Sequence, residues 1–293
     1  MSYFKLLGLY KEPFSTSPDP EFFYMTREHE AALTNLLIDL RLRRGLSVIL
    51  GDVGTGKTTL SRKLVQELKV RNDFVFRIML DPSYPNESSF MRALLDNFNI
   101  AYAGRRQASP ADLRHALKRF LLKRGVSGNR IVVLIIDEAQ KLSLRSLELL
   151  RGLLNFETND YKLIQIVLLG QLELYPKLVG LPNLLDRISF KSLLRPLDLD
   201  EAREMIDFRM HRAGYQPQDC LFDDEAVRLI HEHSQGYPRR ITMLCHKALK
   251  EAVLKNASVI NAGFMRSLMS AGTAGWHNIG ELLSEENQIA YHS

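Results

Sequence analysis

Apolar residues follow two patterns along the first two thirds of the chain. Short, nearly continuous apolar runs predict buried strands, whereas apolar positions spaced three and four residues apart predict helices. The predicted strands cover residues 46–50, 74–80, 131–136, 163–170 and 188–194. The predicted helices cover residues 27–44, 58–70, 86–98, 110–124 and 142–155. This alternation indicates an α/β fold with a mainly parallel, five-stranded sheet covered on both faces.

The pattern changes after Pro196. Helical spacing continues near residues 200–213, 223–234, 238–255 and 261–270, and no strand is predicted there. The first 25 residues are rich in Phe, Tyr and Pro, which favours an extended, packed arm over a helix. Thr26 is placed to cap the first helix, with Glu30 near the end of a capping-box spacing. The predicted parts are an arm with the first helix (1–45), an α/β core (46–196), a helical lid domain (197–270) and a flexible tail (271–293).

Composition is that of a soluble globular protein. The chain has 293 residues, of which 45% are hydrophobic and 25% charged. The longest aliphatic run, residues 131–136, is far too short to cross a bilayer, and the N-terminus lacks the features of a signal peptide. Cys220 and Cys245 are too few for a metal site or a disulfide framework, so we expect reduced, packed thiols in a cytoplasmic protein.

Basic residues are concentrated in one segment. The net charge is only +5, but no acidic residue occurs between Asp112 and Asp137. Apolar residues fit the buried face of a helix in this segment, and basic residues fit its other face. The apolar set is Leu113, Leu117, Phe120 and Leu121, and the basic set is Arg114, Lys118, Arg119, Lys123, Arg124 and Arg130. The basic face is either a solvated helix surface or a contact for nucleic acid or anionic lipid.

The stretch GDVGTGKTTL follows the first predicted strand and opens the next helix. It fits the P-loop pattern G-x-x-x-x-G-K-[ST], which wraps backbone N–H groups around phosphate at a helix N-terminus. Lys57 is expected to reach the outer phosphates, and the Thr58 hydroxyl to bind Mg²⁺. The predicted nucleotide-binding residues here are Gly51, Gly54, Thr55, Gly56, Lys57, Thr58 and Thr59.

Polar residues at the ends of later strands can complete such a site. Asp137 follows the aliphatic strand and is expected to hold Mg²⁺ through water, and Glu138 to act as general base on the attacking water. Gln171, after the next strand, can position the same water. Hydrolysis also benefits from a cation at the γ-phosphate, for which Arg187 and Arg239 are the candidates.

Together these motifs resemble the AAA+ ATPases of the general secretion pathway protein A type, also called ExeA-like. The resemblance covers residues 3 to about 268, with the marks GLYKEPFSTSPDPEFFY, LIIDEAQ, LLNFET, IVLLGQLEL, DRISF, LRPLD and SQGYPRRI beside the P-loop. It implies a P-loop domain and a helical lid with ATP bound between them. It also implies a sensor 1 role for Gln171, a role across a subunit boundary for Arg187, a lid sensor 2 role for Arg239 and adenine contacts near Tyr24.

Full-length secretion members of this family continue into a membrane helix and a periplasmic domain, so this sequence resembles the short, all-cytoplasmic bacterial relatives. The resemblance leaves two functions open. One is an ATPase that forms homo-oligomers and assembles a secretion or pilus machine. The other is a DNA-binding helper of transposition that recruits a transposase. A P-loop switch that scarcely hydrolyses ATP is a third possibility, which the presence of Glu138 disfavours.

Overall fold

A computed structural model describes residues 3–15, 19–102, 108–216 and 221–270. The predicted tail at 271–293 and Cys220 lie outside these described residues. The chain divides into two compact units, one formed by residues 25–195 and the other by residues 1–24 together with 196–293. The first predicted helix therefore groups with the sheet, whereas the N-terminal arm groups with the C-terminal helices.

The sheet of the 25–195 unit is fully parallel and has the strand order β2-β3-β4-β1-β5. The α/β fold class with a five-stranded parallel sheet is thereby confirmed. Residues of the three central strands are almost all buried, because helices cover both faces of a parallel sheet. The strands are β1 (Leu46–Gly51), β2 (Phe74–Met79), β3 (Ile131–Ile136), β4 (Ile164–Gly170) and β5 (Ile188–Leu194).

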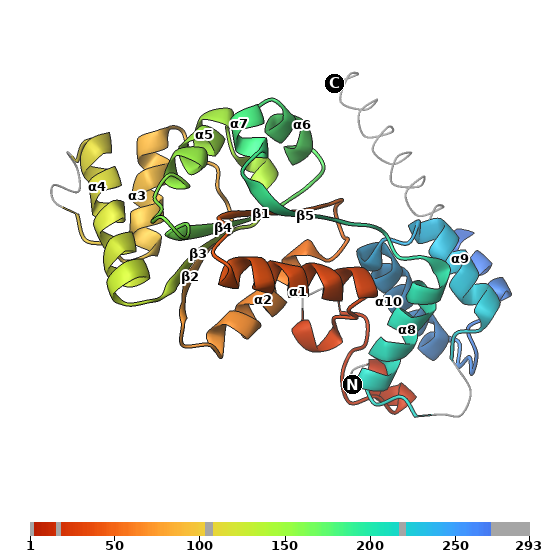
Figure 1. Ribbon diagram of the computed structural model, residues 1–293. Coiled ribbons are helices and arrows are strands. Elements are labelled where there is room, and N and C mark those ends of the chain that lie inside the picture. The colour runs from red at the N-terminus through yellow and green to blue at the C-terminus, as the bar shows by residue number, and fades with distance from the viewer. Residues whose placement is uncertain (1–2, 16–18, 103–107, 217–220, 271–293) are drawn as a thin grey trace, which may run out of the picture. The chain divides into compact units, whose positions relative to one another are not determined.

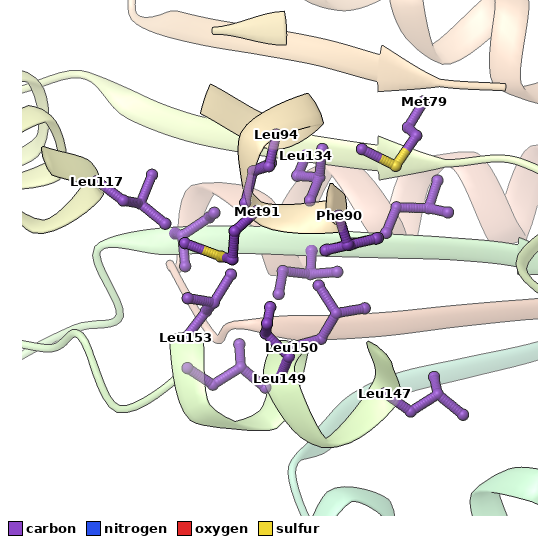
Figure 2. Close-up of a cluster of buried hydrophobic side chains, with 14 of the residues drawn as sticks. Met79, Phe90, Met91, Leu94, Leu117, Leu134, Leu147, Leu149, Leu150 and Leu153 are labelled. Atoms are coloured by element: carbon purple, nitrogen blue, oxygen red, sulfur yellow. The ribbon is translucent and has the colours of Figure 1, made fainter. Parts of the chain in front are cut away.

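Figure 1 shows the helices of this unit on both faces of the sheet. One face carries α1 (Arg27–Arg41) and α2 (Lys57–Lys69), and the other carries α3 (Glu87–Asn97), α4 (Pro110–Leu121) and α5 (Leu144–Leu153). Alternate strand residues supply each face. On the α3–α5 side they pack with leucines of the helices and with Phe90 and Met91 of α3 in a continuous core, part of which is drawn in Figure 2. Each large apolar side chain buried in this core contributes about 1.5–3 kcal/mol relative to leaving it exposed.

Several short elements in this unit were not predicted. Helices α6 (Leu174–Val179) and α7 (Pro182–Leu185) and the 3-10 turn η4 (Ala139–Lys141) span too few residues for a helical period to show in the sequence. The predicted basic helix at 110–124 is α4 followed by η3 (Leu122–Ser127), a π-helical segment. As expected, Leu113, Leu117 and Leu121 on its apolar face are fully buried.

The second unit is helical, as predicted for the region after Pro196. It contains α8 (Leu199–Arg212), α9 (Asp224–Ser234), α10 (Pro238–Leu254) and a further helix over residues 262–270. The N-terminal arm joins the core of these helices through Leu9 and Phe14, and Phe14 packs edge-on against Phe222. The arm is packed as predicted, but it also forms two 3-10 turns, η1 (Tyr3–Leu7) and η2 (Pro20–Phe22), where an extended chain was expected.

Among the residues that the structure describes, no helix has the length and apolar character needed to cross a membrane.

Candidate nucleotide-binding and catalytic site

Three loops that carry predicted site residues leave the same edge of the sheet. Strands β1, β3 and β4 run in the same direction. The register aligns Leu50 of β1 with Gly170 of β4, and Ile136 of β3 with Leu168 of β4. The P-loop follows β1, the Asp137–Glu138 pair follows β3, and Gln171 follows β4. Since β4 lies between β3 and β1, the carboxyl ends of these neighbouring strands bring the three loops together, where α/β sheets commonly bind ligands.

Glycines give the loop after β1 its shape. Gly54 has φ 86° and Gly56 has φ 99°, a left-handed region that side chains disfavour. Gly51 is needed for space, because a Cβ there would lie 2.6 Å from the Thr55 hydroxyl oxygen. Gly56 is the N-cap of α2 and provides no side-chain cap. The first N–H groups of α2, which include those of Thr58 and Thr59, are therefore suited to an anion.

Lys57 is folded into the loop that precedes it. The residue is buried, with 6% relative exposure, and Nζ donates to the carbonyl oxygens of Gly51 and Asp52, at 2.8 Å each. Burial lowers the pKa of the ammonium group, against the opposing effect of the carboxylates of Glu138, Asp137 and Asp52. A buried cation at the start of a helix fits a phosphate-bearing ligand, whose charge would offset the cost of burial.

Thr58 and Asp137 form an oxygen pair suited to a hard cation. Asp137 is buried, and burial raises the pKa of its carboxyl. The Glu138 N–H and the Thr58 hydroxyl donate hydrogen bonds that act in the opposite direction, as does the charge of Lys57. Mg²⁺ commonly takes one or two protein oxygens and completes its shell with water and phosphate. In the described part of the chain there is no cluster of three or more His, Cys, Asp or Glu side chains that could hold a metal ion by themselves.

Two glutamine side chains hold the carboxylate of Glu138. Gln140 Nε2 donates to Glu138 Oε2 at 2.6 Å, and Gln171 Nε2 reaches the same oxygen at 3.4 Å. Glu138 itself has φ 54°, an unusual backbone conformation for a residue with a side chain, and such strain is often stored at functional sites. Gln171 was predicted for this site and is in place beside Glu138. Gln140, the last residue of the LIIDEAQ motif, was not predicted for this site, because nothing in its spacing indicates which way the side chain points.

His29 of α1 was also missed. It is 2% exposed, and its Nε2 lies 3.0 Å from the carbonyl oxygen of Thr55 in the P-loop. Its Nδ1 lies 2.7 Å from the hydroxyl oxygen of Thr26, the N-cap of α1. His29 occupies the third helical position, where the predicted capping box would need Glu30, so the capping-box expectation is wrong. A histidine in an otherwise ordinary amphipathic helix gives no sequence signal for such a contact.

Arg187 lies at the opposite edge of the sheet from the P-loop. It directly precedes β5, whose first residue, Ile188, pairs with Leu46 at the start of β1. The P-loop begins at the far end of that six-residue strand, about 20 Å away at roughly 3.3 Å per residue. Arg187 Nη1 donates to the carbonyl oxygen of Arg151 at 3.2 Å and to Asn155 Oδ1 at 2.6 Å, at the C-terminal end of α5. The structure therefore does not bring Arg187 to the site of its own chain.

Tyr24 and Arg239 belong to the helical unit. The Tyr24 hydroxyl donates to Glu204, and burial together with this bond raises the pKa of the phenol. Its ring lies 5.9 Å from that of Phe208. Arg239 is exposed in the first turn of α10. Their predicted contacts with nucleotide remain predictions.

Comparison with known proteins agrees with this geometry. Residues 40–178 match the AAA domain family. The chain is 37% identical over 264 residues to General secretion pathway protein A of Aeromonas hydrophila, a match that covers 89% of this chain and 47% of that protein. It is 27% identical over 165 residues to an uncharacterized HTH-type transcriptional regulator of Methanocaldococcus jannaschii, of which 40% is covered. The chain thus spans about half the length of the curated relatives that it matches.

Solved structures support the same fold. Cdc6p from Pyrobaculum aerophilum is similar with a TM-score of 0.62 and 20% identity, over 85% of this chain and 67% of that one. The ORC2 protein of Aeropyrum pernix is similar with a TM-score of 0.60 and 19% identity, over 88% and 71% of the two chains. The P-loop fold and the AAA domain match over residues 40–178 support an ATPase of the AAA+ type. The predicted resemblance to general secretion pathway protein A is confirmed by the match over 89% of this chain.

Proposed function

We propose that this ATPase couples the binding and hydrolysis of Mg-ATP to the assembly of a secretion or pilus machine. The observation that carries the proposal is the convergence of Lys57, Thr58, Asp137, Glu138 and Gln171 at one edge of the sheet. The similarity to General secretion pathway protein A supports the secretion context. We expect the protein to work in the bacterial cytoplasm.

Each residue has a distinct role in this proposal. The P-loop N–H groups and Lys57 would bind the phosphates, and Thr58 and Asp137 would hold Mg²⁺, which neutralises phosphate charge. Glu138 takes a proton from the attacking water, and the Gln171 amide orients the same water. The other predicted residues of the loop provide the shape and the donors that this binding needs; they are Gly51, Gly54, Thr55, Gly56 and Thr59.

Arg187 is proposed to act on the nucleotide of a neighbouring subunit. Its position about 20 Å from the P-loop of its own chain, estimated from strand length, makes a role in its own site geometrically unfavourable. A head-to-tail oligomer would bring this edge of one subunit to the P-loop edge of the next. We therefore expect a ring or filament whose active sites each need two subunits. Arg239 and Tyr24 are proposed to contact the nucleotide, as the family resemblance implies.

A second candidate function is a DNA-bound helper of transposition, and one specific surface favours it. A hollow of about 510 Å³ beside α4 and η3 is lined by four cations and two aromatic rings, with no carboxylate among its lining residues. These cations and rings are Arg77, Arg119, Lys123, Arg124, Phe98 and Phe120. Arg114 and Lys118 line a second hollow on the same helix, beside Phe156. Clustered cations of this kind are suited to a phosphate backbone.

The proposed chemistry is tested with Glu138→Gln, which retains the shape of the side chain but removes the base. We expect this variant to bind Mg-ATP with unchanged affinity and to hydrolyse it at least a hundredfold more slowly, since general bases typically contribute about 10²–10⁴-fold. It should also accumulate an ATP-bound oligomer in size-exclusion chromatography with light scattering. Turnover equal to that of the wild type would overturn the assignment of Glu138. Lys141→Ala, an exposed neighbour in η4, is the matched control and should leave turnover unchanged.

A further inference from the structure

We infer that Gln140 is the positioning residue for the Glu138 carboxylate. This inference rests on the proposed function, because it assumes that Glu138 is the general base. Its starting point is the 2.6 Å hydrogen bond from Gln140 Nε2 to Glu138 Oε2. Gln171 Nε2 reaches the same oxygen. Because both donors use Oε2, the other carboxylate oxygen, Oε1, is the one assigned to the water.

The orientation of the Gln140 amide is determined by a third contact. Its Oε1 accepts a hydrogen bond from the backbone N–H of Gln171 at 3.0 Å. An N–H can only donate, so the oxygen of the amide must face Gln171 and its NH₂ group must face Glu138. The end of β4 therefore determines how Gln140 presents its donor. Gln140 thus connects the end of β4 to Glu138 through a single side chain.

The turn that carries Gln140 is itself held in place. Lys177 of α6 donates to the carbonyl oxygens of Gln140, at 2.5 Å, and Leu142, at 3.0 Å. Gly170, the last residue of β4, gives room to α6, since a Cβ there would lie 2.8 Å from Leu174 Cδ2; the nitrogen of Gln140 would be in ordinary contact with it at 3.4 Å. The left-handed backbone of Glu138 then directs its side chain within reach of both amides. A general base must be placed to within a fraction of an ångström, so these contacts have a catalytic consequence.

Two variants separate positioning of the base from a merely structural role. Gln140→Glu retains an oxygen that can accept from the Gln171 N–H but replaces the donor to Glu138 by a second carboxylate. Gln140→Met retains only the length and volume of the side chain. A structural tether would survive in Gln140→Glu and fail in Gln140→Met, whereas the loss of the donor impairs both.

The experiment measures kcat and the ATP KM of both variants between pH 6 and pH 9, with thermal unfolding as a check on folding. For Gln140→Glu we expect kcat to fall by about tenfold or more at pH 8, with KM within about twofold of the wild type. The ratio of its kcat to that of the wild type should rise as the pH falls, because a protonated Glu at position 140 can again donate to Glu138. Gln140→Met should lose a similar factor without this recovery.

The outcomes distinguish the inference from the function on which it rests. Wild-type kcat in Gln140→Glu at every pH, with a loss in Gln140→Met, would overturn the positioning role in favour of a structural tether. The role of Glu138 as the base would still be tested separately by Glu138→Gln. Equal losses in both variants with no recovery at low pH would also overturn it, because turnover would then not depend on a donor at position 140. If Glu138→Gln itself turns over normally, the proposed function fails, whatever the Gln140 variants do.

Discussion

His29 contacts the main chain of the P-loop: its Nε2 lies 3.0 Å from the carbonyl oxygen of Thr55, a fully buried residue. A carbonyl accepts, so Nε2 must carry a proton. The Thr26 hydroxyl oxygen accepts the backbone N–H of His29 and lies 2.7 Å from Nδ1, to which it can donate. These partners are those of a neutral imidazole. The N-terminus of α1 is thereby linked to the main chain that would surround phosphate.

The stability of the sheet-containing unit should depend on pH through His29. Burial lowers the pKa of His29 below its usual 6.5. The unfolded chain therefore binds the proton first as the pH falls, and the free energy of unfolding decreases below about pH 6.5. Above that pH the neutral side chain contributes its full stabilisation.

The variant His29→Gln tests this. We expect it to be less stable than the wild type by about 1–2 kcal/mol at pH 7.5, with a difference that shrinks towards pH 5.5 because glutamine does not titrate. Urea unfolding at several pH values measures both quantities. His115→Gln, on the exposed face of α4, serves as the matched control for the replacement of one histidine. A constant difference between wild type and His29→Gln would contradict the buried, neutral state of His29.

Lys57→Ala should weaken ATP binding at least tenfold, which corresponds to about 1.4 kcal/mol. The variant removes a buried ammonium that bonds the carbonyl oxygens of Gly51 and Asp52, and with it the charge proposed to reach the outer phosphates. Calorimetric titration with ATP measures the affinity, and circular dichroism checks that the fold is retained. Unchanged affinity in a folded variant would rule out the P-loop assignment.

The strands, the strand-end loops and the fold class were predictable because each has a local signature. Five apolar runs and the spacing of Gly51, Gly56, Lys57 and Thr58 were sufficient for the sheet and the P-loop. What could not be predicted depends on side-chain direction across long sequence separations. Gln140 meets Gln171 across 31 residues, and His29 meets Thr55 across 26. Neither contact changes the hydrophobic pattern, so the sequence carries no trace of it.

The N-terminal arm illustrates a different limit. Its prolines and aromatic residues correctly predicted a packed segment, but the grouping with the first helix was a matter of sequence proximity alone. In the structure, Leu9 and Phe14 contribute to the core of the helical unit, whereas Leu36 and Leu40 of α1 are buried in the other unit. Tertiary packing determines which of the two cores an apolar segment joins, and secondary-structure propensity does not encode this packing.

If Arg187 acts on a neighbouring subunit, Arg187→Ala should bind ATP normally yet lose turnover by about 10³-fold or more, as for other arginine fingers. Mixing it with Glu138→Gln should restore part of the activity. One type of interface in a mixed oligomer then pairs an intact Glu138 from the first variant with an intact Arg187 from the second. ATP turnover across a range of mixing ratios measures the rescue.

Light scattering must confirm that the mixed subunits assemble. The absence of rescue at every ratio, in oligomers of normal size, would contradict a role across the subunit boundary. It would instead indicate that the bonds of Arg187 to the Arg151 carbonyl and to Asn155 are its main function, which is to fix the C-terminal end of α5.

Mutation of the basic surface of α4 and η3 distinguishes the two candidate functions. If it contacts DNA, the ATP-bound protein should bind duplex DNA with little sequence preference. Each phosphate contact should add about −0.9 to the slope of log K against log salt concentration. Replacing Lys118, Arg119, Lys123 and Arg124 by Ala should then weaken binding and flatten this slope by several units. The fold should survive, because Leu113, Leu117 and Leu121 on the opposite face are fully buried and untouched.

A charge-matched variant separates a specific surface from net charge. It replaces four exposed cations elsewhere, Arg41, Arg44, Lys69 and Lys247, by Ala and should retain most of the affinity and slope. The measurement is a salt titration with fluorescent duplex DNA, with and without a slowly hydrolysed ATP analogue. Equal losses in both variants would mean that only net charge attracts DNA. If the protein shows no ATP-dependent binding to DNA at about 0.1 M salt, where the Debye length is about 10 Å, the transposition hypothesis is left without support. The secretion or pilus ATPase is then favoured.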